Sequence, residues 1–275
     1  MEQNNPTIVN LTPELRLEQA IKEASIDNPS SIVKLIINGL ITENDCMFIY
    51  QNMNKTLQEL DMSSALFENN TIPIYGFTEC KRLTSVTIPD SVVEFVYKAF
   101  AGCENLISVI IPDSVREMGA ETFHGCTSLQ SVHISSSATY IGFQSFKECV
   151  NLKSVIIPNS VDYIDHCAFY GCSGLTSINI PNSVTEIGAK AFYDCTALTS
   201  VTIPCSVVKI GRCTFKGCTA HITVHPDNPV YKSVNGKLKR KRKIIRLFFQ
   251  PRRKKTGQTH QNYSTLRYKS AQIVS

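Results

Sequence analysis

Most features that mark an enzyme or a membrane protein are missing from these 275 residues. No apolar run approaches the roughly 18 residues that cross a bilayer. The opening stretch, MEQNNPTIVNLTPELRLEQ, lacks the apolar core of a signal peptide. The histidines are dispersed, the acidic residues form no catalytic pair, and no phosphate-binding loop occurs. We therefore expect no enzyme, no catalytic residue, no cofactor and no membrane span, and as encoded a cytoplasmic chain.

Acidic residues are absent from the last part of the chain. Residues 1–227 hold 14 Lys and Arg against 23 Asp and Glu, a balance of −9, whereas residues 228–275 hold 14 basic residues and no acid, a balance of +14. Such an asymmetry marks a basic segment as a separate feature. Two interpretations stay open for it: a solvated edge hairpin, whose lysines discourage strand pairing, or a surface that binds polyanions. Base-specific nucleic-acid binding is not expected, because stacking aromatics and a nucleic-acid fold are missing.

A disulfide framework is also not expected, although the chain has eleven cysteines. Small secreted scaffolds place paired cysteines in chains of less than about 80 residues. Here seven cysteines recur at a fixed spacing of 23 residues, at Cys80, Cys103, Cys126, Cys149, Cys172, Cys195 and Cys218. We interpret these as buried free thiols. Cys213, Cys218, His221 and His225 have zinc-like spacing, but their expected faces diverge, so we predict no metal site.

The same spacing of 23 residues governs the middle of the chain. Phenylalanine recurs at Phe77, Phe100, Phe123, Phe146, Phe169, Phe192 and Phe215, and leucine at Leu83, Leu106, Leu129, Leu152, Leu175 and Leu198. A fixed period in this range indicates a solenoid of the leucine-rich-repeat type. We predict an α/β fold: a curved parallel β-sheet, short helical turns on its convex side and a helical N-terminal cap. The phenylalanines are expected to stack as a buried spine.

Each unit divides into three predicted parts. The pattern LxxVxI is a strand whose leucine and later aliphatic residues face inward, and the proline after it ends the pairing. A serine then follows (Ser91, Ser114, Ser160, Ser183 and Ser206), whose hydroxyl is expected to satisfy backbone groups of the turn. The segment AFxxC is the helical turn, preceded by a glycine that we interpret as its N-cap (Gly119, Gly142, Gly188 and Gly211). One repeat, with Ser135–Ala138 in place of the usual pattern, is expected to be the softest.

The ends of the array differ from its middle. A helix is predicted over residues 13–25, with Thr12 as its N-cap, and another after Thr42, running to about Met53. Between and after them lie two atypical repeat strands, 32–37 and 57–62. Near the other end, Asn235-Gly236 indicates a β-hairpin. The predicted divisions are a cap with two atypical repeats (1–68), regular repeats (69–225), a basic hairpin (226–255) and a disordered tail (256–275).

The unit IPxSVxxIGxxAFxxCxxLxSV resembles the BspA-like, or treponemal-type, leucine-rich repeats over about residues 72–225. The segments ITENDCMFI and DNPVYKSVNGKL also resemble parts that accompany these repeats. The resemblance implies a secreted or cell-surface location and adhesion to a protein partner, such as a host matrix or cell-surface protein. An intracellular interaction scaffold remains an alternative, and we expect a monomer.

Two candidate surfaces follow. The outward face of the sheet is the first, because solenoids bind partners through such faces. It contains Ser108, Ile110, Ser131, His133, Ser154, Ile156 and Asn179. The alternative is polyanion binding through the basic segment, for which the candidates are Lys239, Arg240, Lys241, Arg242, Lys243, Arg252 and Arg253.

Overall fold

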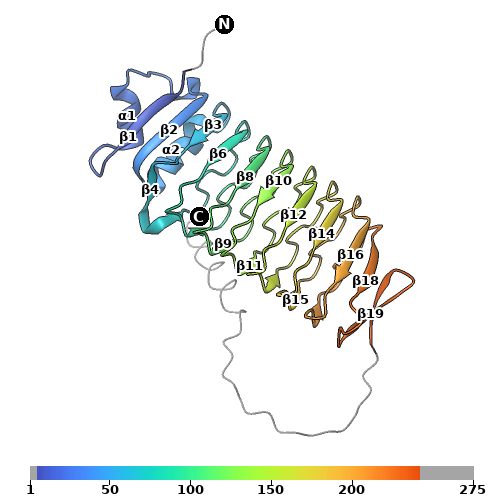
Figure 1. Cartoon of the computed structure of the whole chain (residues 1–275). Coiled ribbons are helices and arrows are strands. Elements are labelled where there is room, and N and C mark those ends of the chain that lie inside the picture. Colours follow the sequence, from blue (N-terminus) through green and yellow to red (C-terminus); the bar gives the residue numbers. More distant parts are fainter. Residues whose placement is uncertain (1–4, 242–275) are drawn as a thin grey trace, which may run out of the picture. The chain divides into compact units, whose positions relative to one another are not determined.

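The computed structural model of the chain describes residues 5–241, which form one compact unit. Apart from an antiparallel hairpin near its C-terminal end, the strands of this unit pair in parallel and follow one another along the array (Figure 1). The N-terminal elements are β1 (Thr7–Leu11), α1 (Leu17–Glu23), the short 3-10 helix η1 (Pro29–Ser31), β2 (Lys34–Ile41), α2 (Glu43–Met53), β3 (Glu59–Asp61), β4 (Ala65–Phe67) and the 3-10 helix η2 (Glu68–Asn70). The predicted leucine-rich-repeat solenoid is confirmed. Neither α-helix has the length and apolar character that a membrane crossing requires.

The regular repeats contribute two series of strands. The first comprises β6 (Ser85–Thr87), β8 (Ser108–Ile110), β10 (Ser131–His133), β12 (Ser154–Ile156), β14 (Ser177–Asn179), β16 (Ser200–Ile203) and β18 (His221–Val224). The second comprises β5 (Thr71–Ile72), β7 (Glu94–Phe95), β9 (Glu117–Met118), β11 (Tyr140–Ile141), β13 (Tyr163–Ile164), β15 (Glu186–Ile187) and β17 (Lys209–Ile210). Equivalent residues pair in register, as Ser131 does with Ser108 and Ser154. The second series did not follow from the sequence pattern.

The AFxxC segments are turns rather than helices. In residues 5–241 the helices lie only within the N-terminal part, up to Asn70. The turn instead has left-handed backbone at the residue directly before each AFxxC segment, with φ between 53° and 58° at Lys98, Glu121, Gln144, Cys167, Lys190 and Cys213, and again at Glu148 (62°) and Asp194 (56°) inside two segments. Its amides donate across to the neighbouring repeat, as Phe146 N does to Ala168 O (2.8 Å). Because inter-repeat bonds already satisfy these backbone groups, a helical turn is not needed.

The glycines before these turns are therefore not N-caps. Gly119 N donates to Phe95 O in the preceding repeat (2.7 Å), and a Cβ on Gly119 would lie 2.6 Å from that oxygen. Gly188 and Gly211 make the corresponding bonds to Ile164 O and Ile187 O. Glycine leaves room for this close approach between repeats, although Val96 and Asp165 make the equivalent bonds to Ile72 O and Ile141 O in their repeats.

The predicted phenylalanine spine is confirmed. Phe77 to Phe192 are fully buried, and successive rings stack with centroids 5.3–5.6 Å apart as far as Phe215. From Phe100 onward the ring planes lie within 8° of parallel. Phe215, at the end, is only half-buried. The core is thus a continuous column of aromatic rings flanked by the leucines and valines of the strands.

Six of the seven spaced cysteines connect neighbouring repeats through hydrogen bonds. All eleven cysteines are free thiols. Six of the seven donate through Sγ to a phenylalanine carbonyl of an earlier repeat, as Cys149 does to Phe123 O (3.1 Å) and Cys172 to Phe146 O (3.0 Å). Burial raises the pKa of the Cys126 thiol to about 12 and holds the pKa of Cys149 well above its usual value. Cys126 and Cys149 are therefore protonated hydrogen-bond donors in the native state.

The serines behave as predicted at one position and not at four. Ser114 Oγ donates to Val92 O (2.6 Å). The hydroxyls of Ser91, Ser160, Ser183 and Ser206 are buried without a hydrogen-bond partner. The reason lies in the turn itself, where a valine amide donates to the proline carbonyl three residues earlier, as Val161 N does to Pro158 O (3.1 Å). The valine amide is thus satisfied without the serine, both in these turns and in that of Ser114, where Val115 N donates to Pro112 O (3.0 Å).

The irregular repeat contains compensating bonds. Ser135 Oγ donates to Val115 O, and Ser136 N donates to Asp113 Oδ1 (2.7 Å), which connects this repeat to the one before it. Ala138 takes the place of the usual valine and is fully buried. That this repeat is the least stable of the array stays a prediction, which site-resolved amide exchange would test.

At the N-terminus, one predicted helix start is wrong and the other is confirmed. Helix α1 begins at Leu17 instead of after Thr12, because Leu17 N donates to Asp45 Oδ1 (2.8 Å), 28 residues away in sequence. Helix α2 begins after Thr42 and ends at Met53, as predicted. Thr42 and Asp45 form a reciprocal capping box. Asp45, 2% exposed, thus holds the start of both helices and also pairs with Arg16 (3.1 Å).

The predicted hairpin is confirmed as β19 (Tyr231–Val234) and β20 (Lys237–Arg240), with Asn235 and Gly236 both at positive φ. The buried Asn228 connects it to the array: its Nδ2 donates to Pro204 O (2.7 Å) and Val207 O (2.9 Å). Its Oδ1 accepts from Val230 N and Tyr231 N. The hairpin is therefore bonded to the repeat array, and the predicted division of the chain at residues 68, 225 and 255 stays a prediction.

Candidate functional site

The sheet face consists of the outward side chains of the first series of strands, the even-numbered strands from β6 to β18. Strands β8, β10, β12 and β14 have an exposed–buried–exposed pattern, in which the central valine or isoleucine points into the core. The first outward position is serine in six consecutive strands, from Ser85 to Ser200. Serine at this position offers one donor and two acceptor lone pairs per repeat. The face is therefore a regular array of small hydroxyl groups at a spacing of about 4.8 Å.

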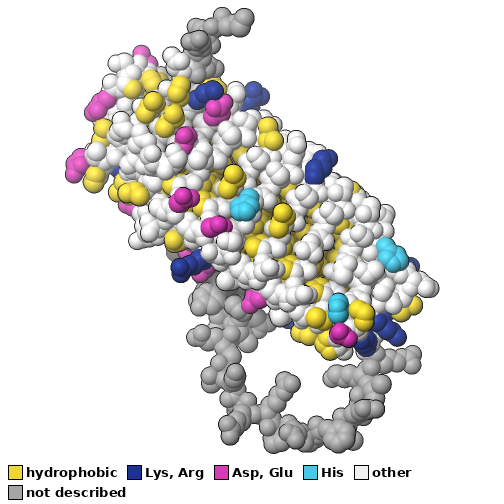
Figure 2. All heavy atoms as spheres, in the orientation of Figure 1, with side chains coloured by type: hydrophobic (Ala, Val, Ile, Leu, Met, Phe, Trp, Pro, Cys, Tyr) yellow, Lys and Arg dark blue, Asp and Glu magenta, His cyan; other side chains and the backbone are white. Residues whose placement is uncertain are grey.

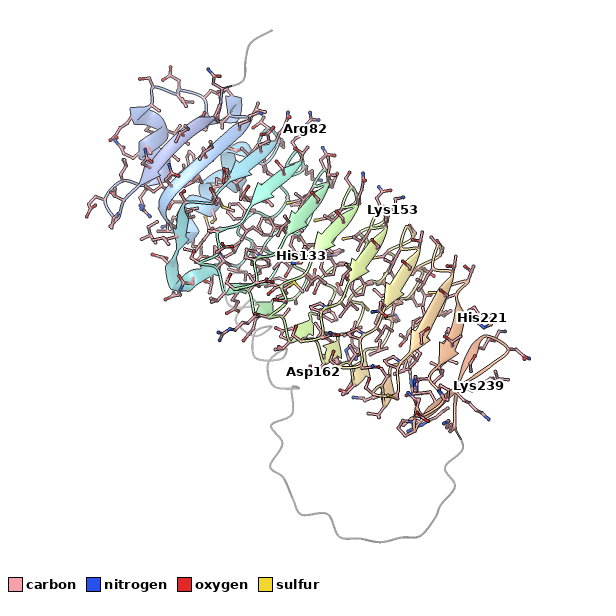
Figure 3. All side chains as sticks on the ribbon, in the orientation of Figure 1. Arg82, His133, Lys153, Asp162, His221 and Lys239 are labelled. Atoms are coloured by element: carbon pink, nitrogen blue, oxygen red, sulfur yellow. The ribbon has the colours of Figure 1, made fainter. Side chains whose placement is uncertain are left out.

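The second outward position varies, and it contains the apolar part of the face. Ile110 is 71% exposed and Ile156 is 80% exposed, whereas the other isoleucines of these strands face the core. His133 lies between them, paired in register with Ile110 on β8 and with Ile156 on β12 (Figure 3). All seven predicted sheet-face residues are exposed and lie on four adjacent strands. Figure 2 shows this face as largely uncharged, with hydrophobic side chains along its middle.

A hollow of about 360 Å³ opens at the end of strands β8 and β10. Its apolar wall is formed by Ile110, Ile111 and Pro112, and His133, the neighbour of Ile110 on the next strand, also lines it. A volume at the low end of ligand-site sizes admits one or two side chains rather than a large molecule. The hollow is thus continuous with the exposed Ile110–His133 surface.

Two carboxylates border this hollow, and sequence reasoning missed them. Asp90 and Asp113 occupy equivalent positions in successive repeats, directly after the proline that ends each strand. The Ser136 amide and hydroxyl hold the pKa of the Asp113 carboxyl below its usual range. The signal was available, because the position after the proline reads Asp, Asp, Ser, Asn, Asn, Cys along the array when the repeats are aligned.

The basic candidates are only partly brought together. Lys239 and Arg240 are exposed on β20. Lys241 instead turns inward, where its Nζ donates to Asn228 O (2.6 Å). The other four, Arg242, Lys243, Arg252 and Arg253, lie outside the described residues.

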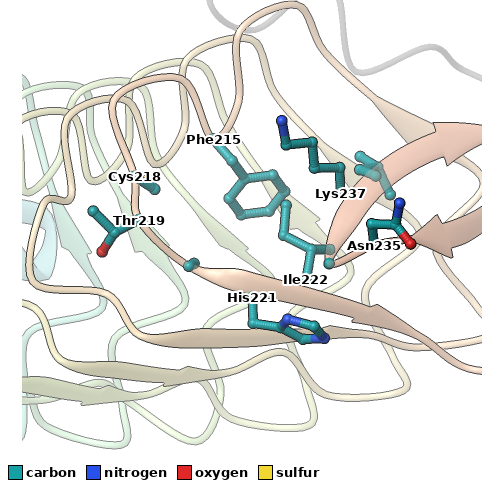
Figure 4. Close-up of a pocket in the computed structure, with 10 residues that line it drawn as sticks. Phe215, Cys218, Thr219, His221, Ile222, Asn235 and Lys237 are labelled. Atoms are coloured by element: carbon teal, nitrogen blue, oxygen red, sulfur yellow. The ribbon is translucent and has the colours of Figure 1, made fainter.

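A second hollow, of about 420 Å³, lies between the last repeat and the hairpin (Figure 4). The half-buried Phe215, the last ring of the spine, forms its floor together with Cys218 and Ile222. His221 and Lys237 are the ionisable side chains at its rim. Within residues 5–241, no three His, Cys, Asp or Glu side chains are grouped as metal ligands would be. Cys213 is exposed, and His225 Nδ1 accepts from Asp227 N (3.3 Å).

Comparison with family models identifies the repeat type. A model described as "BspA type Leucine rich repeat region" matches in six copies, over residues 47–174 and 139–255. These ranges together span well over half of the chain. The comparison with curated proteins found no match.

Solved structures of bacterial leucine-rich repeat proteins have a similar fold. One from Bacteroides ovatus is 24% identical, with a TM-score of 0.57, and the match covers 77% of this chain and 55% of that one. One from Eubacterium ventriosum is 19% identical, with a TM-score of 0.51 and coverage of 67% and 59%. The leucine-rich repeat protein of T. pallidum is 30% identical over 45% of this chain and 54% of its own, with a TM-score of 0.35. The chain spans little more than half the length of the first two proteins.

Proposed function

The chain belongs to the BspA-type leucine-rich repeat family, and from this premise we propose that it is a non-enzymatic module that binds another protein through its sheet face. Adhesion to a host matrix or cell-surface protein is the form that the family resemblance favours. The same surface would serve an intracellular scaffold. We propose that the chain acts as a monomer.

The observation that supports this proposal is the exposed pair Ile110 and Ile156 on either side of His133. Covering one isoleucine side chain contributes about 1.5–3 kcal/mol relative to leaving it exposed. Single exposed aliphatic residues are ordinary on protein surfaces. Here two exposed isoleucines occupy equivalent positions two strands apart. In-register pairing fixes the backbone between them, so they form a preorganised contact surface. The neighbouring serines and Asn179 supply the polar rim that protein interfaces usually have.

Polyanion binding is the second candidate, supported by exposed Lys239 and Arg240 at the start of a stretch with 11 basic residues in 19, residues 237–255. The two candidates respond differently to salt. Attraction between exposed charges is screened beyond about 8 Å at physiological ionic strength, whereas contact through isoleucine, serine and histidine is nearly insensitive to salt.

Three full-length variants separate these functions. The face variant replaces Ile110, His133 and Ile156 by glutamate. Its matched control replaces three exposed valines away from the sheet face by glutamate: Val93, Val150 and Val208. The tail variant replaces Lys239, Arg240 and the basic residues of 242–255 by glutamine.

Binding is measured by surface plasmon resonance to a panel of immobilised extracellular-matrix proteins, and folding by circular dichroism. We expect the face variant to lose binding while folded, and the control and tail variants to retain it with a flat salt profile. Steep salt dependence that disappears in the tail variant would contradict the proposal and favour polyanion binding.

A further inference from the structure

The acidic border of the first hollow is confined to one part of the sheet face. Asp90 and Asp113 follow the strand-ending prolines of the two repeats that include β6 and β8. Later repeats have uncharged residues at the same position: Ser136, Asn159, Asn182 and Cys205. The charge therefore coincides with the hollow beside Ile110 rather than running along the whole array. In Figure 2 acidic side chains lie beside a histidine and hydrophobic side chains on this face.

Within residues 5–241, neither carboxylate takes part in an ion pair with a basic side chain. Other acids on the array do: Glu104 pairs with Lys81 (2.7 Å), and Glu186 with Lys209 (2.6 Å). Asp113 is held in place, because its Oδ1 accepts from Ser136 N at 2.7 Å. One oxygen of Asp113 is thus fixed by the protein, and the carboxylate stands at the rim of the hollow with His133 as the nearby group that attracts it.

Apolar wall and acidic rim together specify the chemistry of an occupant. In this wall Ile111 and Pro112 are buried and Ile110 is 71% exposed, so Ile110 offers the apolar surface for one aliphatic side chain in a hollow of about 360 Å³. The two carboxylates suit a cationic side chain, since guanidinium and ammonium groups form charge-assisted hydrogen bonds with carboxylates. In an extended peptide, residues i and i+2 point to the same side, about 6.6 Å apart. An aliphatic residue and an arginine at that spacing can reach both parts at once.

We propose that the hollow bordered by Asp90 and Asp113 binds a segment of the partner protein in which an aliphatic side chain is followed two residues later by arginine or lysine. This inference rests on the proposed function, because it assigns a partner chemistry to one end of the same sheet face. Charge complementarity selects this occupant over an acidic or purely apolar segment.

The test uses three fluorescein-labelled nonapeptides of glycine and serine that differ at two central positions. The first contains Leu-Ser-Arg, the second Leu-Ser-Glu and the third Ala-Ser-Arg. Fluorescence anisotropy with the full-length chain gives their relative affinities. We expect Leu-Ser-Arg to bind most tightly. Replacing arginine by glutamate should weaken binding by at least tenfold, because attraction becomes repulsion. Replacing leucine by alanine should weaken it about tenfold.

Two double variants provide the matched comparison. Asp90→Asn with Asp113→Asn removes the acidic rim, and should reduce binding of the Leu-Ser-Arg peptide about fivefold at low salt, as two exposed charge contacts are lost. Asp162→Asn with Asp227→Asn makes the same change in charge at exposed positions away from the hollow, and should leave the affinity unchanged. The discrimination between leucine and alanine should persist in both, because Ile110 is intact.

Several outcomes would overturn the assignment. Equal binding of the arginine and glutamate peptides would do so, as would equal loss in the two double variants. Dimerisation of the chain that the Leu-Ser-Arg peptide reverses, detected by sedimentation, would make a second copy the occupant. The proposed function fails separately, when the face variant retains binding to the matrix panel. If the face variant loses that binding while the chain binds the three peptides equally well, the proposed function stands and this inference alone is wrong.

Discussion

Removing one ring from the middle of the phenylalanine column should destabilise the protein by about 4 kcal/mol. Phe169 is fully buried and stacks on Phe146 and Phe192 with centroids 5.3 Å away on each side. Exposing a buried phenylalanine side chain costs about 1.5–3 kcal/mol. A residual cavity of about 80 Å³ adds about 2 kcal/mol at roughly 24 cal/mol per Å³. The sum agrees with the ~3–5 kcal/mol usual for Phe→Ala in a packed core, a large share of a typical stability of about 5–15 kcal/mol.

The assay is equilibrium unfolding in urea, followed by circular dichroism and tyrosine fluorescence. Coincident transitions by both probes would justify a two-state free energy for the array. Phe215→Ala is the matched control, because Phe215 is half-buried and its ring stacks on Phe192 at one end of the column. It should cost about 1–2 kcal/mol, as its burial is partial and one stacking contact is lost. A loss below about 1 kcal/mol for Phe169→Ala, or equal losses at both sites, would refute the reasoning.

Three further outcomes follow from the structure. In native protein a thiol reagent should label Cys149 far more slowly than exposed Cys213, and mass spectrometry showing equal rates would contradict its burial. Asn228→Ala should lower stability by about 2–4 kcal/mol, measured by thermal unfolding, because it removes two donated and two accepted hydrogen bonds at a fully buried site. Burial alone would raise the pKa of Glu121, but the hydrogen bond from His124 and nearby charge outweigh it and lower that pKa. The stabilisation that the ionised Glu121 carboxylate gives to the fold is therefore fully present above its unfolded-state pKa of about 4.3. It is lost as the pH falls through the lower pKa of the folded state. Glu121→Gln should make the free energy of unfolding fall less steeply at acid pH. An unchanged pH dependence, measured by urea unfolding at several pH values, would show that the carboxylate contributes nothing.

The parts of the fold that the sequence predicted well are those set by repetition. A side chain that recurs every 23 residues must occupy the same environment in every unit, so burial of the phenylalanines and exposure of the serine row followed directly. The hairpin at Asn235-Gly236 was predictable for a local reason, since both residues tolerate positive φ. The helix after Thr42 also had its capping residues adjacent in sequence.

The predictions that failed depend on contacts between segments distant in sequence. The start of α1 is set by Asp45, not by Thr12, and no local pattern reveals that bond. The AFxxC turns are not helices because their amides find partners in the next repeat. Strand β1 (Thr7–Leu11) forms because β2 offers it a paired edge. At the candidate site, the sheet-face residues were predictable from alternation, whereas the hollow beside Asp90 and Asp113 depends on how two successive turns are placed.

The regularity of the phenylalanine column has a consequence for folding fidelity. If one segment of the array docked one unit out of step, phenylalanine would still meet phenylalanine, and cysteine would still face a phenylalanine carbonyl. The core contacts would thus be nearly the same after a shift of 23 residues, so they favour the correct alignment only weakly over a shifted one. What distinguishes them is at the two ends: the Asp45 network and the Asn228 bonds have no counterpart elsewhere among the described residues. The contacts at the two ends therefore fix the alignment of the repeats, while the phenylalanine column supplies most of the stability. A substitution that weakens either end should therefore raise the population of misaligned molecules more than its effect on the free energy of unfolding alone would suggest.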